Sequence, residues 1–290
     1  CAFDAHFQSS LSDNRHKRRL LMRISKWCVR GMCFTLMLLL ANAAGAQNAP
    51  QKLNVLIVTG FDVGAHKWRE TTSQTRLILE KTGRFNVRVC EDVGIFESSA
   101  IDDYDVIVLN YGFWRTPDPS QKAKEGLLKY VTGGKGLVAL HFSCSSFQEW
   151  QQYRELLGRV WKKGVGGHGP RGKFTVNIKK SDHPHPITKG LSDFEMDDEL
   201  YAKLSGDAQI EVVASAYSDW SKKVEPIVFV KDYGKGRVVH NVLGHDHRAR
   251  QNETYQSLLR RGVEWAATGK VTQAVPKDFP TAEKISTRYK

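Results

Sequence analysis

Cysteine is scarce in this chain, and long metal-binding signatures are missing. Of the 5 cysteines, only Cys90 and Cys144 follow residue 46. Neither an HExxH pattern nor paired CxxC motifs occur, so no common zinc signature is present. If the strands follow the flavodoxin-like order 2-1-3-4-5, the strands next to these two cysteines lie roughly 14 Å apart. A disulfide needs Cα atoms within about 7 Å, so we predict two free thiols.

No apolar run is long enough to span a membrane. Residues 31–41 form the longest run near the amino terminus, and Asn42 ends it well short of the roughly 20 residues that a span requires. Basic residues precede this run, and a small-residue cleavage site ending at Ala46 follows it. We therefore interpret residues 1–46 as an over-extended reading frame, with its true start at Met22, and a secretory signal. An anchor helix is the alternative. The signal predicts an exported protein, periplasmic or secreted, with no stable membrane anchor.

The charge is positive but dispersed. The formal net charge is +12; removing residues 1–46 removes 7 of 43 Lys and Arg and 2 of 31 Asp and Glu, which leaves 36 − 29 = +7. The basic residues are scattered as pairs such as Lys162–Lys163, and no block is interleaved with aromatics. We predict no nucleic-acid partner. The remaining chain suits one domain over 47–270, followed by a surface tail over 271–290.

Short apolar, β-branched runs alternate with helical patterns along the chain. Strands are predicted at 52–60, 85–90, 105–110, 136–140, 174–178, 211–216, 227–230 and 236–244, and helices at 68–81, 119–131, 147–157 and 254–267. The alternating pattern of 174–178 is typical of an exposed or edge strand, and 197–201 of an acidic turn or short strand. Alternation of strands and helices predicts an α/β fold with a mostly parallel sheet covered on both faces.

Histidines gather where strands end. Of the 10 histidines, His6 and His16 precede residue 46, which leaves eight. His240 lies inside an apolar strand pattern. The other seven follow strands or lie in loops rich in Gly and Pro: His66, His141, His168, His183, His185, His245 and His247. Ligands of open α/β sheets bind beyond the carboxyl ends of the strands, and histidine is the most frequent metal ligand, so we predict one site there.

His141 is the central candidate of this site. It occupies a strand-to-helix turn, where many α/β enzymes place a nucleophile, but the glycines of that signature are missing. We favour a ligand or acid–base role; a hydrogen-bonded core residue and a Cys/His pair with Cys144 are the alternatives. Of His245 and His247, which point to opposite faces of extended backbone, we expect His245 to face the site and Asp246 to orient it.

The acidic segment 197–199 supplies the carboxylate that such a site requires. The alternative is that this segment is a solvated turn without a function. We predict that His66, His141, Glu199 and His245 meet at the carboxyl edge of the sheet, with ligating atoms roughly 3–6 Å apart. They would bind a divalent metal, most simply Zn²⁺. Alternatively His141, His245 and Glu199 act as acid–base groups. His168 and His183 are weaker candidates, because turns often carry such residues as caps.

Several motifs in a fixed order resemble the ThuA-like (trehalose utilisation) family, a branch of the class I glutamine amidotransferase-like superfamily. The resemblance runs from about Lys52 to Gly269. The matching pieces are 65–68 (AHKW), 104–106 (YDV), 134–141 (GKGLVALH), 166–168 (GGH), 182–187 (DHPHPI), 198–201 (DELY), 234–238 (GKGRV) and 243–246 (LGHD).

The resemblance implies a flavodoxin-like three-layer sandwich and a role in catabolism of trehalose, related disaccharides or keto-sugars. The amidotransferase branch carries Cys where this chain has His141, so glutamine hydrolysis is not expected. A small-molecule sugar is the implied partner. Its contacts would come from stacking aromatics, from Asp246 and from the loop around Asp62 and Gly64. The candidate aromatics are Trp68, Tyr111, Trp114 and Tyr201. A carbohydrate-binding protein without turnover and a Cys144 thiol hydrolase are the alternative functions.

Overall fold

The computed structural model describes residues 51–61, 63–277 and 279. The predicted start and signal over 1–46, Asp62 and most of the predicted tail lie outside the described residues. The elements are β1 (Leu53–Gly60), α2 (Trp68–Glu80), β2 (Phe85–Cys90), η1 (Val93–Glu97), η2 (Ser99–Asp103), β3 (Val106–Tyr111), α3 (Gln121–Thr132), β4 (Gly136–Leu140), η3 (His141–Ser145), α4 (Gln151–Leu157), β5 (Gly167–His168), β6 (Gly172–Ile178), β7 (Phe194–Asp198), β8 (Tyr201–Ala202), β9 (Glu211–Ser218), β10 (Lys223–Tyr233), β11 (Gly236–Asn241), α5 (His247–Arg250) and α6 (Glu253–Thr268). None of the helices described is long and apolar enough to cross a membrane.

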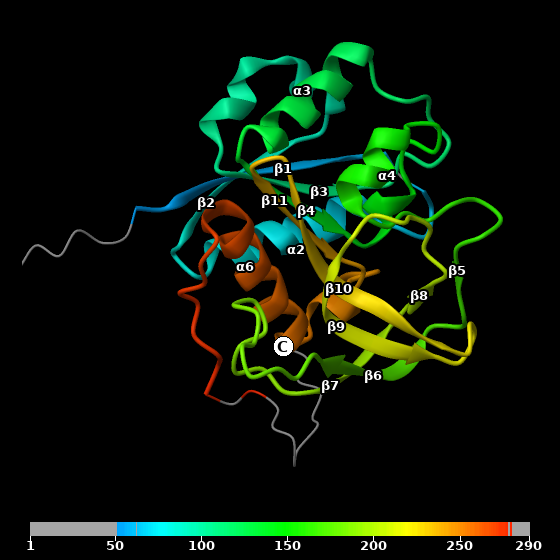
Figure 1. Cartoon of the computed structure of the whole chain (residues 1–290). Helices are drawn as coiled ribbons and strands as arrows, with labels where there is room; N and C mark the ends of the chain where they lie inside the picture. Colours follow the sequence, from blue (N-terminus) through cyan, green and yellow to red (C-terminus); the bar gives the residue numbers. More distant parts are fainter. Residues whose placement is uncertain (1–50, 62, 278, 280–290) are drawn as a thin grey trace, which may run out of the picture. The chain divides into compact units, whose positions relative to one another are not determined.

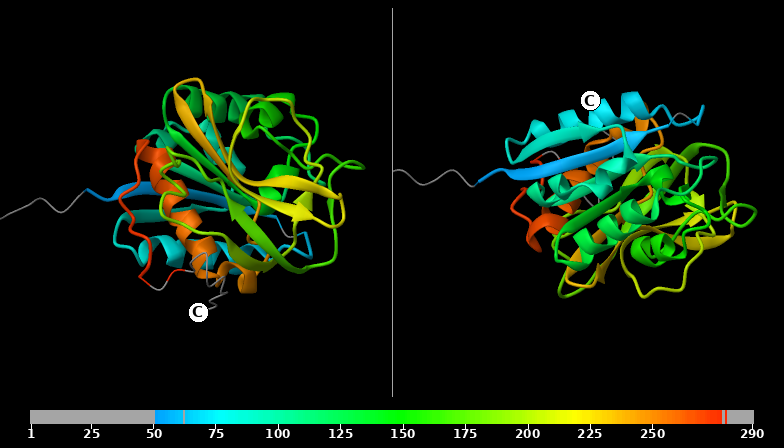
Figure 2. Two further views of the ribbon diagram at one scale, coloured as in Figure 1. Left: turned by 60° about the horizontal axis from the view of Figure 1, so that its bottom comes forward. Right: turned by 90° about the horizontal axis from the view of Figure 1, so that it is seen from above.

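One nine-stranded sheet organises the fold, in the order β2-β1-β3-β4-β11-β10-β9-β6-β7. The first five strands are parallel to their neighbours, in the flavodoxin-like order that the sequence predicts. The remaining strands extend this part with antiparallel pairs. Figure 2 shows the yellow β9 and β10 on the side of the sheet away from the blue β1. A separate two-stranded ribbon joins β5 and β8.

Helices cover the parallel strands on both faces. Helices α2 and α6 lie below the sheet in Figure 1, and α3 and α4 lie above it. Helix α6 contacts β4 and β11, and α2 contacts β1, β2 and β3. Strands β3 and β4 are buried at every residue, as the continuous apolar runs predict for parallel strands with both faces covered. The predicted three-layer α/β architecture is confirmed.

The structure also corrects local predictions. The helix predicted from 147 begins only at Gln151, because Phe147 has a positive φ of 54° that no helix can include. Of the two alternatives for 174–178, the structure shows an exposed strand, since side chains of β6 alternate in exposure. It is not an edge strand, because β6 pairs with both β9 and β7, and β7 forms the edge. The prediction of two free thiols is confirmed, with Cys144 buried and Cys90 half-buried.

Candidate functional site: a histidine–glutamate cluster

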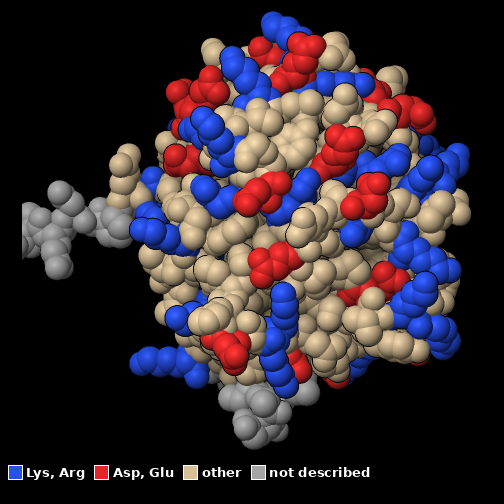
Figure 3. Space-filling model, viewed as in Figure 1, with Lys and Arg blue, Asp and Glu red and all other residues tan. Residues whose placement is uncertain are grey.

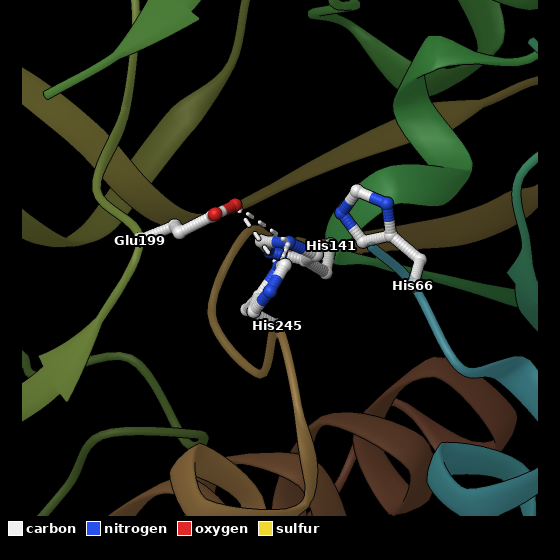
Figure 4. A group of neighbouring side chains, drawn as sticks. All are labelled: His66, His141, Glu199 and His245. Atoms are coloured by element: carbon white, nitrogen blue, oxygen red, sulfur yellow. Dashed lines mark hydrogen bonds and ion pairs between the residues drawn. The ribbon is translucent and has the colours of Figure 1, made fainter. Parts of the chain in front are cut away.

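Four side chains from distant segments meet at the carboxyl edge of the parallel strands (Figure 4). They are His66 in the loop after β1, His141 at the end of β4, Glu199 between β7 and β8, and His245 after β11. One nitrogen or oxygen atom from each lies within 4.8 Å of the other three. The structure thus brings together the four residues that the sequence singles out. We call them the His/Glu cluster.

His141 is held in a defined tautomer. Its Nδ1 lies 2.7 Å from the carbonyl oxygen of Val242, which can only accept, so Nδ1 carries the proton. Its Nε2 therefore presents a lone pair to the cluster, 3.3 Å from Nδ1 of His245. The backbone of His141 has a φ of +43°, an uncommon conformation for a residue with a side chain, and the ring is 2% exposed. Strain at this strand end aims the imidazole at the cluster, as sharp turns do in other α/β sites.

Glu199 provides the carboxylate of the cluster. Its Oε2 lies 3.0 Å from Nδ1 of His245 and 3.9 Å from Nε2 of His141. On its more exposed side it faces Nε2 of His168 at 3.7 Å. His168, which the sequence ranks as a weak candidate, is therefore a fifth neighbour of the site. Its ribbon β5 pairs with β8, where His168 is opposite Tyr201, and this pairing places the ring beside Glu199.

His66 completes the cluster from the opposite side. Its ring stacks on Phe142, with centroids 3.9 Å apart and planes 4° apart, and its Nε2 lies 3.2 Å from the hydroxyl of Tyr201. Its Nδ1 is buried and has no hydrogen-bond partner among the residues described. A buried imidazole nitrogen without a partner is costly. Figure 4 shows this Nδ1 on the side of the ring away from the other three residues, so Nε2 is the nitrogen of His66 that faces the cluster.

The histidines differ in protonation. Burial, together with nearby His245, lowers the pKa of His66 to about 3, and burial beside both other rings lowers that of His141 well below 6.5. Burial alone would also lower the pKa of His245, but the hydrogen bond and charge of Glu199 raise it. Burial likewise opposes ionisation of Glu199, yet the His245 contact lowers its pKa. Two rings are thus neutral, whereas the carboxylate of Glu199, 3.0 Å from Nδ1 of His245, favours the protonated form of His245.

Asp198 fixes two arms of the cluster at once. Its buried carboxylate accepts backbone N–H groups from Glu199 at 2.9 Å, Gly244 at 2.6 Å and His245 at 3.1 Å. Burial raises its pKa to about 6, although these hydrogen bonds act in the opposite direction. Gly244 has a φ of +95°, and a Cβ there would lie 2.6 Å from the Tyr255 ring. The turn that carries His245 therefore requires glycine.

A buried arginine clamps the same turn. Arg250 is 2% exposed, and its guanidinium donates to the carbonyl of Gly244, the hydroxyl of Thr75 and the amide oxygen of Asn110. Neither Arg250 nor the role of Asp198 is evident from the sequence pattern. Arg250 lies between the strand predicted at 236–244 and the helix predicted at 254–267, where an arginine carries no local signal of burial. Only the packing of α5 against α2 encloses it.

The other predicted histidines do not join the cluster. His183 and His247 are exposed, and His185 packs on Trp265 with centroids 4.7 Å apart. His240 is buried in β11 beside Phe229. Of the seven strand-end histidines, the structure therefore brings four together, with His168 included. The choice of His245 over His247 agrees with the structure.

The aromatics expected to stack on sugar are mostly covered. Trp68, Tyr111 and Tyr201 are 7%, 3% and 1% exposed, and Trp114 is half-buried. Trp68 and Tyr111, with three of the clustered histidines, line a cavity of about 20 Å³, enough for about one water. Trp68, Tyr111 and Tyr201 therefore enclose the cluster, and none of the three presents an open face on which a sugar could stack. Gly64 is exposed, and Asp62 lies outside the described residues.

The structure also bears on two further predictions, the role of Asp246 and the Cys144 thiol alternative. Asp246, expected to orient His245, instead caps α5 through the N–H of Ala249 and pairs with Arg171; Glu199 and Asp198 hold His245 in its place. Cys144 is fully buried, and burial raises the pKa of its thiol to about 12. A nucleophilic cysteine needs a lowered pKa and access, so the geometry disfavours a thiol enzyme.

This chain is similar to one known protein family and to several solved structures. The family ThuA, described as trehalose utilisation, matches residues 54–266. A ThuA-like protein from Parabacteroides merdae ATCC 43184 is 32% identical, with 82% of this chain and 98% of that chain covered and a TM-score of 0.72. A ThuA-like protein from Bacteroides uniformis ATCC 8492 is 19% identical, with 79% and 96% covered and a TM-score of 0.61. A cytoplasmic protein from Salmonella typhimurium LT2 is 17% identical, with 74% and 99% covered and a TM-score of 0.52. The latter two show the fold alone. A comparison with curated proteins gave no match.

The sheet order and the cluster at its carboxyl edge define a flavodoxin-like α/β protein with a polar strand-end site. Within that class the chain belongs to the ThuA family, since the family spans most of its length and a ThuA-like structure shares a third of its residues.

Proposed function

We propose that this ThuA-family protein acts on a sugar at a divalent-cation site formed by the His/Glu cluster. The observation that carries the proposal is the convergence of four potential ligand atoms within 4.8 Å, from segments spread over most of the described chain. The sugar is proposed from the family description, trehalose utilisation, with a disaccharide or its keto derivative as the substrate class.

The residues fit a cation such as Zn²⁺. Such ions bind neutral imidazole nitrogens and carboxylate oxygens in tetrahedral sets, often with one position left for water or substrate. His141 presents a free Nε2, and its Nδ1 is fixed by Val242, as outer partners usually fix metal-bound histidines. The Glu199 carboxylate and Nε2 of His66, the nitrogen that Figure 4 shows turned toward the other three residues, supply further donors. His245 joins the set once it gives up the proton that Glu199 stabilises.

The chain's own groups divide the remaining work. A bound cation would polarise a sugar carbonyl or activate water. Glu199 and His168 lie at the more exposed side of the cluster, where His168 is 34% exposed, so a proton can pass between His168 Nε2 and a sugar hydroxyl there. Trp68, Tyr111 and Phe142 line the buried side of the cluster and leave room there for no more than about one water. Without a cation, His141, His245 and Glu199 retain the donors and acceptors for acid–base chemistry.

Location and partners complete the proposal. Export rests on the sequence pattern over 1–46 alone. A small-molecule sugar, and no nucleic acid, is the proposed partner. In support, Figure 3 shows Lys and Arg side chains intermixed with Asp and Glu on the face that it draws, with no basic field of one sign.

Two measurements test the proposal. Metal analysis after gentle purification is expected to find about one divalent cation per chain, and incubation with trehalose and its keto derivatives to yield altered sugar that a chelator prevents. Unchanged turnover in chelator would remove the cation but leave acid–base chemistry. A sugar that protects the protein thermally yet emerges unaltered would identify a binding protein. If the protein neither binds nor turns over any disaccharide, the proposal is overturned.

A further inference from the structure

A second cavity, of about 270 Å³, adjoins the ribbon that carries the cluster. We call it the Trp220 pocket. Its lining combines three aromatic rings with carboxylates and small residues: Gly169, Pro170, Gly172, Lys173, Phe174, Asp198, Leu200, Tyr217, Ser218, Asp219 and Trp220. Its volume is close to the lower end of the roughly 300–1,000 Å³ found for small-molecule sites, and its few polar groups among aromatics match their usual composition.

Two of the three rings of this pocket, Tyr217 and Trp220, are unusually exposed. Trp220 is 43% and Tyr217 50% exposed, whereas Trp68, Tyr111 and Tyr201 are covered. The chain fixes the indole nonetheless: a Cβ on Gly167 would lie 2.4 Å from Trp220, so the ring lies directly on glycine backbone. Lys203 Nζ lies over one face of the ring, 4.5 Å from the ring centroid, so a sugar can stack only on the opposite face. A rigid, half-open indole is what a sugar ring needs, since its C–H face packs on an aromatic face at little entropic cost.

The Trp220 pocket shares its walls with the cluster. Asp198 and Leu200 line the pocket and flank Glu199 in sequence, and Gly169 follows His168. His168 and Glu199 themselves face each other at 3.7 Å. A ligand that fills the pocket therefore lies against the same short segments that carry the exposed side of the cluster.

We propose that the Trp220 pocket binds a pyranose ring of the substrate, so that a disaccharide is held by one ring here while the other approaches the His/Glu cluster. Trp220 and Tyr217 supply the stacking faces, and the carboxylate of Asp219 accepts hydroxyl hydrogens. This inference rests on the proposed function, to which it adds the place where one ring of the disaccharide is held.

Calorimetry with trehalose and with glucose tests the inference on the full chain. Trp220→Ala and Tyr217→Ala are each expected to weaken trehalose binding about tenfold, the loss of one aromatic contact. Gly167→Ala, which displaces the indole, is expected to weaken it in the same direction. Leu77→Ala is the control, since Leu77 is 65% exposed and lies outside the pocket. Divalent-cation binding, measured in parallel, should be unchanged in all four variants.

The outcomes separate the two proposals. Trehalose that binds wild type and both aromatic variants equally, with melting temperatures unchanged, overturns the Trp220 pocket and leaves the proposed function intact. If Trp220→Ala fails to fold, Tyr217→Ala and Gly167→Ala decide by the same criterion. A wild-type protein that binds neither sugar overturns both proposals. Glucose bound as tightly as trehalose overturns the two-ring arrangement.

Discussion

The imidazole of His141 donates from Nδ1 to the carbonyl oxygen of Val242 at 2.7 Å, across 101 positions of sequence. This bond joins the end of β4 to the segment after β11, which are neighbours only because these strands pair in the sheet. It decides which nitrogen of His141 faces the cluster.

Two variants of His141 separate this anchor from the ligand atom. His141→Asn keeps an N–H near the Nδ1 position and tolerates the positive φ, but it lacks an atom at Nε2. We expect it to fold and to lose more than about 100-fold in Zn²⁺ affinity, beyond the 10–100-fold typical of outer partners. His141→Gln is expected to be the less stable of the two, because it loses the Val242 bond. Calorimetric titration and thermal melts provide the readouts; wild-type affinity in His141→Asn would contradict the assignment.

Replacing the glutamate tests the ion pair. Glu199→Gln keeps the shape of the side chain and removes the charge that raises the pKa of His245 above 6.5. The pKa of His245, followed by NMR of its ring protons in chelator, should therefore fall relative to wild type. Cation affinity should also decrease, since a charged ligand is lost. A His245 pKa that stays unchanged would show that another group holds its proton.

Asp198 is predicted to act as a positioning residue. Asp198→Asn presents an amide where three backbone N–H groups converge, so hydrogen bonds to Glu199, Gly244 and His245 are weakened together. Hydrogen bonds to charged groups contribute about 1.5–3 kcal/mol each, so we expect a loss of roughly 2–4 kcal/mol in the free energy of unfolding. Denaturant unfolding measures it. Cation affinity should fall as well, although Asp198 is not a proposed ligand; a stability loss with intact affinity would assign Asp198 to the fold alone.

Stability should depend on pH through His240. Burial lowers its pKa from 6.5 to about 4. Between these two pH values His240 is therefore protonated in the unfolded chain and neutral in the folded protein. This contribution is complete above pH 6.5 and is lost as pH falls toward 4, by about 3 kcal/mol at most. His66 acts in the same direction and Asp198 in the opposite one. Both contributions are the same in wild type and in His240→Leu, so they cancel when the two proteins are compared in chelator. The variant should lose less stability between pH 7 and pH 4; parallel curves would exclude His240 as the cause.

The thiol alternative makes an opposite prediction. If Cys144 only fills the core, Cys144→Ala should keep full sugar binding and turnover, and should lose about 1 kcal/mol of stability from the small cavity. Thiol labelling of the native protein should modify Cys90 long before Cys144, which is fully buried. Loss of turnover in a folded Cys144→Ala protein would restore the thiol hypothesis.

Much of the fold could be predicted locally. The runs 106–109 and 137–140 are apolar at every position, which is the pattern of parallel strands covered on both faces, and the structure has them so. Strand ends then predict where side chains can converge, and this geometry is why His66, His141 and His245 could be named together. The start of α4 could not be predicted, because the positive φ of Phe147 follows from its packing and not from any glycine or proline signal.

The sequence by itself determined the strand–helix alternation, the family and the identity of the clustered residues, because hydrophobic period and strand-end position are local properties. Only the tertiary structure decided what those residues face. Burial of Tyr201, the neutral state of His141 and the role of Asp198 all depend on contacts between segments far apart in sequence. The same is true of Trp220. Its place in a turn gives no sign in the sequence of the contacts with Gly167 and Lys203 that hold its ring in the folded protein. Desolvation and cross-chain hydrogen bonds fix protonation and orientation, and neither exists before the chain has folded.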